Sequence, residues 1–130
     1  SPAGWRNHNR HRDMARLHGR AGRAIEERTW LLKAVEAMEP AVAADERDPL
    51  ELGETCDALA WTYHREFKPW GEATRWSKEA VRHKEAALER GTGDPLSLGG
   101  AYQGLGWIFH HTRHPARSRA HLPVMARGGT

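Results

Sequence analysis

Residues 48–65 read DPLELGETCDALAWTYHR, and residues 94–111 read DPLSLGGAYQGLGWIFHH. The two stretches stand 46 positions apart (94 − 48) in one register. Eight of the eighteen positions are identical: Asp48/Asp94, Pro49/Pro95, Leu50/Leu96, Leu52/Leu98, Gly53/Gly99, Leu59/Leu105, Trp61/Trp107 and His64/His110. A period of about 20 to 50 residues is typical of stacked arrays, in which one unit needs a neighbour to bury its apolar face. The repeat therefore predicts an all-α protein of stacked antiparallel helix-turn-helix units, an α-solenoid.

The register extends toward the N-terminus with weaker matches. Trp30 lies 46 positions before Trp76, and His18 lies 46 positions before His64. We therefore expect about two and a half units in one contiguous domain. Their predicted bounds are a disordered lead-in at 1–8, a degenerate first repeat at 9–47, a second repeat at 48–93 and a partial third repeat at 94–127.

Apolar residues spaced three or four apart predict the helices inside these units. The expected helices cover residues 9–18, 23–43, 50–66, 70–90 and 96–111. Asp48 and Asp94 are predicted to cap their helices, each followed by a proline at the first helical position. Pro40 is expected to kink or end the helix over 23–43. Pro123 limits any further helix over residues 115–127.

The bulk composition fits a thin layered protein. The chain has 130 residues, of which 38% are hydrophobic and 28% charged, enough for one domain or a few stacked units. Its one cysteine, Cys56, excludes an internal disulfide and fits a reducing compartment, so a cytoplasmic location is expected. The sequence contains no run of eighteen apolar residues, so it predicts no membrane span. Because the chain begins with Ser1, we expect a trimmed piece of a longer protein or assembly.

Charge is unevenly distributed along the chain. Residues 1–23 hold six arginines and one aspartate, and residues 95–130 hold four arginines and no acid. Acidic side chains outnumber basic ones, sixteen to ten, between residues 24 and 94. Basic ends are an ordinary solvated surface in one interpretation, and in another they bind nucleic acid or an acidic partner.

The repeated helix resembles the tetratricopeptide repeat. Tyr102-x-x-Leu105-Gly106-x-x-Phe109 matches the first half of that motif, and Cys56-x-x-Leu59-Ala60-x-x-Tyr63 matches it with Ala in place of Gly. Ala73 and Ala80 supply the small residues seven apart that the second helix requires. The period of 46 exceeds the usual length of about 34 residues, and the first unit departs most.

The resemblance implies a concave groove, lined by the first helix of each unit, that binds an extended peptide or partner protein. The groove residues it implies are Asp57, Trp61, His64, Arg65, Gln103, Trp107, His110, His111 and His18. Aromatic rings beside cationic donors are common in recognition hot spots. Trp61 and Trp107 have a second interpretation as packing between units, and Trp30 and Trp76 are expected in the core.

Other chemistry finds little support in the sequence. His110 and His114 are four apart, but no acid follows them to complete a metal site. Cys56 occupies a core position and is expected to be an unreactive buried thiol. We expect no enzyme, cofactor or metal. The predicted function is a protein-interaction module, with two alternatives: an RNA-binding helical module, or a domain that self-associates.

Overall fold

The computed structural model describes residues 2–67 and 70–113, and this part of the chain is helical with no strand. The elements are α1 (Pro2–Arg20), α2 (Ala24–Ala43), α3 (Leu50–Thr62), the short π-helix η1 (Tyr63–Phe67), α4 (Trp70–Glu89) and α5 (Pro95–Arg113). The prediction of an all-α protein is confirmed. The possible helix over residues 115–127 lies outside the described residues.

The start of the first helix differs from the prediction, and the predicted effect of Pro40 is settled by the structure. α1 begins at Pro2 instead of Asn9, so residues 2–8 are helical and the expected disordered lead-in is corrected. Proline is tolerated in the first turn of a helix, where its missing N–H has no partner to lose. α2 ends at Ala43, as predicted, and Pro40 lies inside the helix without ending it.

The two repeated Asp-Pro pairs start their helices in the same way. Asp48 Oδ1 accepts a hydrogen bond from the Leu50 N–H at 2.8 Å, and Asp94 Oδ1 accepts one from the Leu96 N–H at 3.0 Å. These bonds satisfy backbone donors that the first turn leaves without a helical partner. The capping role predicted for Asp94 is confirmed, with Pro95 as the first residue of α5. At α3 the N-cap residue is Pro49, so Asp48 lies one position further out than predicted and bonds the first turn from there.

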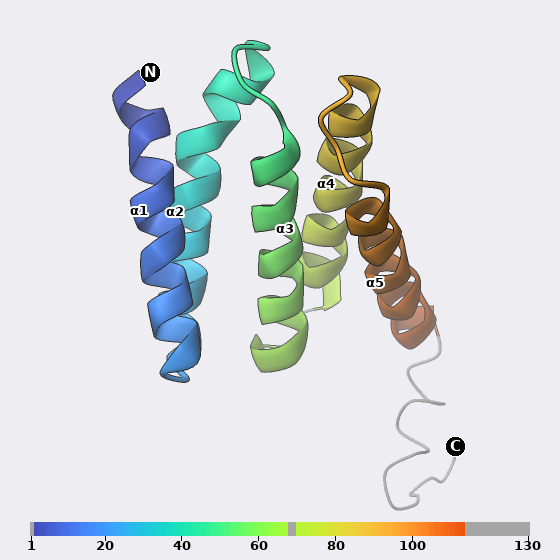
Figure 1. Ribbon diagram of the computed structural model, residues 1–130. Coiled ribbons are helices and arrows are strands. Elements are labelled where there is room, and N and C mark those ends of the chain that lie inside the picture. Colours follow the sequence, from blue (N-terminus) through green and yellow to red (C-terminus); the bar gives the residue numbers. More distant parts are fainter. Residues whose placement is uncertain (1, 68–69, 114–130) are drawn as a thin grey trace, which may run out of the picture.

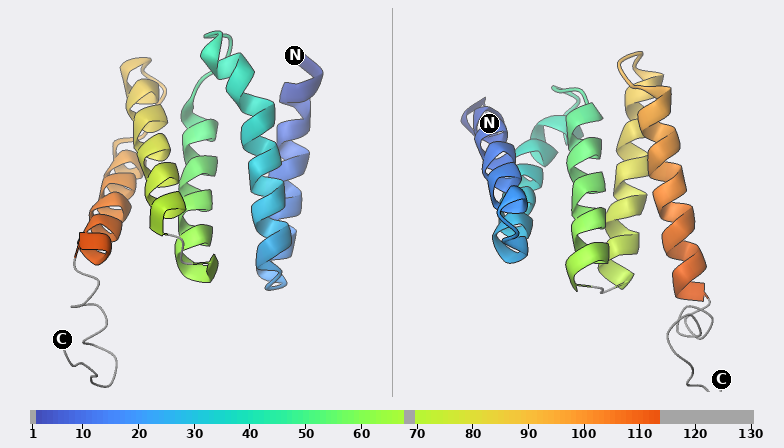
Figure 2. Two further views of the ribbon diagram at one scale, coloured as in Figure 1. Left: turned by 180° about the vertical axis from the view of Figure 1, so that it is seen from behind. Right: turned by 60° about the horizontal axis from the view of Figure 1, so that its bottom comes forward.

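Consecutive helices lie side by side, and the contacts are most extensive between α1 and α2 and between α3 and α4. Figures 1 and 2 show α1, α3 and α5 on one side of the molecule and α2 and α4 on the other. The core lies between these two layers. Its buried members are Ala15, Leu31, Ala34, Val35, Met38, Leu52, Cys56, Leu59, Ala60, Tyr63, Ala73, Trp76, Ala80 and Ile108.

Polar side chains and one glycine set the spacing of the helices around this core. His8 Nε2 lies 2.5 Å from Glu51 Oε2 and Arg12 lies 3.7 Å from the same carboxylate, so α1 is tied to α3. A Cβ added at Gly53 would lie only 2.9 Å from the Lys84 Cγ, so this glycine allows α4 to approach α3 closely. Within the described part of the chain, no helix combines the length and apolar character needed to cross a membrane.

Candidate functional site

Four of the predicted groove residues form a ring cluster between α3 and α5, which we call the Trp–His cluster: Trp61, His64, Trp107 and His111. The His64 ring meets the Trp107 ring edge-on, with centroids 4.2 Å apart, and the Trp61 ring edge-on at 5.5 Å. His111 stacks on Trp107 at 3.4 Å between centroids, and its Nδ1 lies 2.9 Å from the Trp107 carbonyl oxygen. The second and third repeat units are joined through these four rings.

The two tryptophans of the cluster pack against neighbouring groups and also remain partly exposed to solvent. A Cβ added at Gly104 would lie 3.3 Å from the Trp61 ring, so Trp61 rests against a part of α5 that has no side chain. Trp61 and Trp107 are nevertheless each 41% exposed. The two interpretations of these residues are therefore compatible, since each indole helps to join the units and also presents apolar surface to solvent.

The local backbone decides which histidine enters the cluster. His64 lies in η1, where the π-helix places it half-buried against Trp107. Its repeat equivalent His110 lies in the regular helix α5 and is exposed, and its ring centroid lies 5.6 Å from that of His111. His18 bonds within the first helical hairpin, where its Nδ1 accepts from Arg23 Nε at 2.8 Å. The predicted column of three histidines therefore has three different environments.

The charged residues predicted for the groove already have partners. Asp57 receives the Lys84 ammonium at 3.3 Å, and the same Nζ donates to the Ser97 carbonyl at 3.3 Å. Arg65 donates to Glu27 at 3.1 Å and to Glu66 at 2.6 Å. Gln103 is exposed on α5. Asp57 thus holds the helices together, whereas Arg65 and Gln103 lie at the surface.

Two residues that shape the site did not emerge from the sequence. Lys84 is only 4% exposed although it is charged, and it joins α4 to both α3 and α5. Its burial could have been predicted from helical spacing, because Lys84 lies four residues after Ala80 and three before Ala87 on the buried side of α4. Gly104, on which Trp61 rests, had no such signal, because its repeat equivalent is an alanine on an exposed part of α3.

The remaining predictions for aromatic and thiol groups agree with the structure. Trp76 is 5% exposed and belongs to the core, and Trp30 packs against the core with the His11 ring 5.5 Å away. Burial raises the pKa of the Cys56 thiol to about 12, with the nearby Glu79 and Glu39 carboxylates adding to the shift. A thiol with so high a pKa is not a nucleophile at neutral pH.

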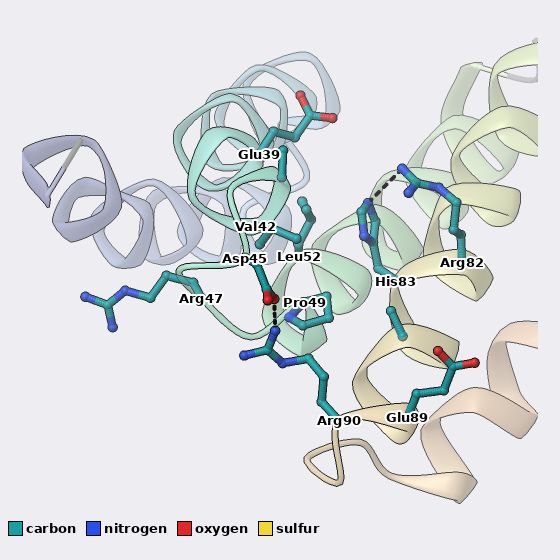
Figure 3. A pocket seen from close by; sticks show the side chains of 12 residues that line it. Glu39, Val42, Asp45, Arg47, Pro49, Leu52, Arg82, His83, Glu89 and Arg90 are labelled. Carbon is teal, nitrogen blue, oxygen red and sulfur yellow. Dashed lines mark hydrogen bonds and ion pairs between the residues drawn. The ribbon is translucent and has the colours of Figure 1, made fainter.

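A cleft of about 630 Å³ opens between the end of α2, the start of α3 and the second half of α4 (Figure 3). It is lined by Glu39, Val42, Ala43, Asp45, Arg47, Pro49, Leu52, Arg82, His83, Ala86, Glu89 and Arg90. Asp45 pairs with Arg90 across it, and Arg82 lies 3.4 Å from His83 Nε2. Burial and the adjacent Arg82 charge lower the pKa of His83. Cations and carboxylates alternate around the cleft, so it concentrates no charge of one sign.

Among residues 2–67 and 70–113, no group of three or more His, Cys, Asp or Glu side chains is placed to hold a metal ion. No protein-family model matches this sequence, and neither a curated protein nor a solved structure matches it. The function is therefore inferred from the geometry of the chain itself.

Proposed function

We propose that this protein is an interaction module in which helical hairpins stack as in tetratricopeptide repeats and the layer of α1, α3 and α5 binds a peptide segment of a partner protein. The alternation of the helices between two layers supports this arrangement. So does the order of contacts, which runs from each helix to the next. The bound segment lies across α3 and α5, over the Trp–His cluster.

The observation that carries the proposal is that the two cluster tryptophans are fixed by ring contacts and yet partly exposed to solvent. Trp61 and Trp107 are each held by ring contacts on one side and are 41% exposed on the other. A rigid, partly exposed indole loses little conformational freedom on binding and offers a large apolar area, which is why tryptophan is enriched in binding hot spots. The cluster fits an apolar side chain of the peptide, and Gln103 beside it can bond the peptide backbone.

A peptide suits this surface better than RNA does. Bases stack well on tryptophan and histidine, but nucleic-acid binding also needs uncompensated positive charge along the phosphate backbone. Next to the cluster, the Arg65 guanidinium is paired with both Glu27 and Glu66. This arginine therefore offers little uncompensated positive charge beside the rings.

Selection from a displayed random-peptide library tests the proposal. Peptides selected on the wild-type protein should lose about 30-fold or more in affinity for Trp107→Ala, as expected for a hot-spot residue. Ile25→Ala is the matched control, because Ile25 is an exposed apolar residue on α2, in the other layer. Circular dichroism is used to check that both variants are folded.

Two results would contradict the proposal. Selected peptides that bind Trp107→Ala and Ile25→Ala as tightly as they bind the wild type would place recognition elsewhere. Alternatively, the affinity of an RNA pool for the wild type could fall steeply with salt and drop again in Trp107→Ala while no peptide is selected, which would assign the cluster to nucleic acid.

A further inference from the structure

The face of α5 that carries Leu98, Tyr102, Leu105 and Phe109 differs from its repeat equivalent in what covers it. The equivalents 46 positions earlier are Leu52, Cys56 and Leu59 on α3 and Tyr63 at the start of η1, and all four are buried. On α5 the two leucines are half-buried, while Tyr102 is 47% exposed and Phe109 is 39% exposed. We call these four residues the α5 stripe.

Two glycines beside the α5 stripe show the same difference. Gly53 on α3 lies so close to α4 that a Cβ there would meet Lys84, whereas its equivalent Gly99 has nothing within 4 Å. Ala60 on α3 is buried, whereas its equivalent Gly106 is exposed and likewise open. α5 therefore has the kind of surface that α4 covers on α3, and no helix among residues 2–67 and 70–113 covers it in the same way. Figure 1 shows α5 at the edge of the array, opposite α1.

Two charged side chains of α4 lie beside the aromatic residues of the α5 stripe. At one level the Lys78 ammonium lies 5.4 Å from the centre of the Phe109 ring. Seven residues further along α4, the Glu85 carboxylate accepts a hydrogen bond from the Tyr102 hydroxyl. The face thus holds two aromatic–charge pairs of opposite sign, about 10 Å apart along the helices at 1.5 Å per residue.

We infer that two copies of this chain dimerise through α4 and α5 about a two-fold axis that passes between these pairs. The axis brings Lys78 of each copy to Glu85 of the other and Phe109 to Tyr102, because a two-fold contact repeats each pairing. The two α5 helices run antiparallel and cross near Gly106, where the missing side chain allows close approach. Each α5 then lies on its partner much as α4 lies on α3.

This dimer is independent of the peptide site. Trp107 and the rest of the Trp–His cluster lie on the flank of α5 that faces α3, whereas the α5 stripe faces away from it, beside α4. A failure of the dimer therefore leaves the proposed peptide site untouched, and a failure of peptide selection leaves the dimer untouched.

Sedimentation velocity on the full chain measures the association. The mass should rise from 14.7 kDa toward about twice that value as the concentration increases from micromolar to millimolar. Lys78→Glu makes both charged positions acidic and Glu85→Lys makes both basic, so each variant alone should associate at least about tenfold more weakly than the wild type. Both side chains are exposed, and folding of each variant is checked by circular dichroism.

Mixing the two variants gives the decisive measurement. In a one-to-one mixture every acidic pair on one copy faces a basic pair on the other, so a heterodimer should form with about wild-type affinity. The double variant Lys78→Glu/Glu85→Lys should also regain self-association. These two restorations identify the two-fold pairing, since a general effect of either substitution on solubility would not be reversed by the other.

Other outcomes overturn the inference. A wild-type monomer at every concentration excludes the dimer, and NMR cross-peaks between the Tyr102 ring and residues 114–130 would then assign the α5 stripe to the C-terminal segment of the same chain. A wild-type dimer that is unaffected by either charge reversal would place the contact on another face. Failure of the two variants to associate with each other would exclude the proposed axis.

Discussion

Alanine at Gly53 and alanine at Gly99 should change stability in opposite directions, although both glycines follow a leucine in the repeated DPL segment. At Gly53 the new Cβ would lie 2.9 Å from Lys84 Cγ, 3.2 Å from the Lys84 backbone nitrogen and 3.3 Å from His83 Cβ. At Gly99 it would meet nothing within 4 Å. The two glycines have similar local sequences, but a neighbouring helix lies close to Gly53 and none lies within 4 Å of Gly99.

The expected free energies follow from two opposing effects. Alanine in place of a helical glycine stabilises the folded state by about 0.5–1 kcal/mol, because the unfolded chain has less freedom to lose. Gly99→Ala should show this gain in full. Gly53→Ala must also push α4 away from α3, and overpacking of this kind costs about 1–3 kcal/mol. Its net loss should be about 1 kcal/mol, so the two variants should differ by about 2 kcal/mol.

Urea unfolding at low protein concentration measures this difference without a contribution from self-association. The same gap should appear as about 8 °C between the melting temperatures, at about 4 °C per kcal/mol for a chain of this size. Equal stabilisation in both variants would refute the reasoning, because it would mean that α3 and α4 are not in close contact at Gly53. Equal destabilisation would mean that the face of α5 at Gly99 is covered.

Three further predictions concern the core and its charged groups. Leu59 is fully buried, so Leu59→Ala should lower the free energy of unfolding by about 3 kcal/mol in urea titration. Asp57→Asn should cost about 2 kcal/mol, because it leaves the Lys84 ammonium, which is 5% exposed, without its carboxylate. Lys84→Met should cost less, since the Asp57 carboxylate that it leaves behind is 23% exposed and can be hydrated; an equal or larger loss for Lys84→Met would contradict this reasoning. The lowered pKa of His83 means that the unfolded state binds its proton first, so stability should fall as pH drops below about 6.5 toward the folded-state pKa. His83→Gln should flatten that part of a melting-temperature profile, and an unchanged slope would assign the dependence to other groups.

The repeat predicted most of the helical elements because capping and apolar spacing act locally. The Asp-Pro pairs predict helix starts at residues 50 and 96, and the two helices begin at Leu50 and Pro95. The predicted turn before α5 is also present, and Gly91 in it has a positive φ of 83°. The N-terminal residues were misread because their polar composition hides a helix whose inward side is His8 and Ala15. Composition alone does not show that His8 is held by Glu51, which lies 43 residues away.

Four of the nine predicted groove residues lie together in the Trp–His cluster, and the contacts among them were not predictable from the repeat. Repeat matching placed Trp61 and Trp107 on the same side of neighbouring units, and the structure brings both into contact with His64. The same matching gave Asp57 a binding role, whereas its carboxylate is engaged by Lys84. A contact of this kind depends on how two helices cross, which a one-dimensional repeat does not record.

The π-helix η1 makes the two copies of the repeated segment unequal. Its wider turn falls on Tyr63–Phe67, while the corresponding residues of α5 remain in a regular helix. Identical letters at His64 and His110 therefore end in unlike surroundings, one ring against Trp107 and the other exposed. Translation by one repeat unit does not reproduce the surface, so a peptide bound as proposed should have one preferred direction and should not slide from one unit to the next.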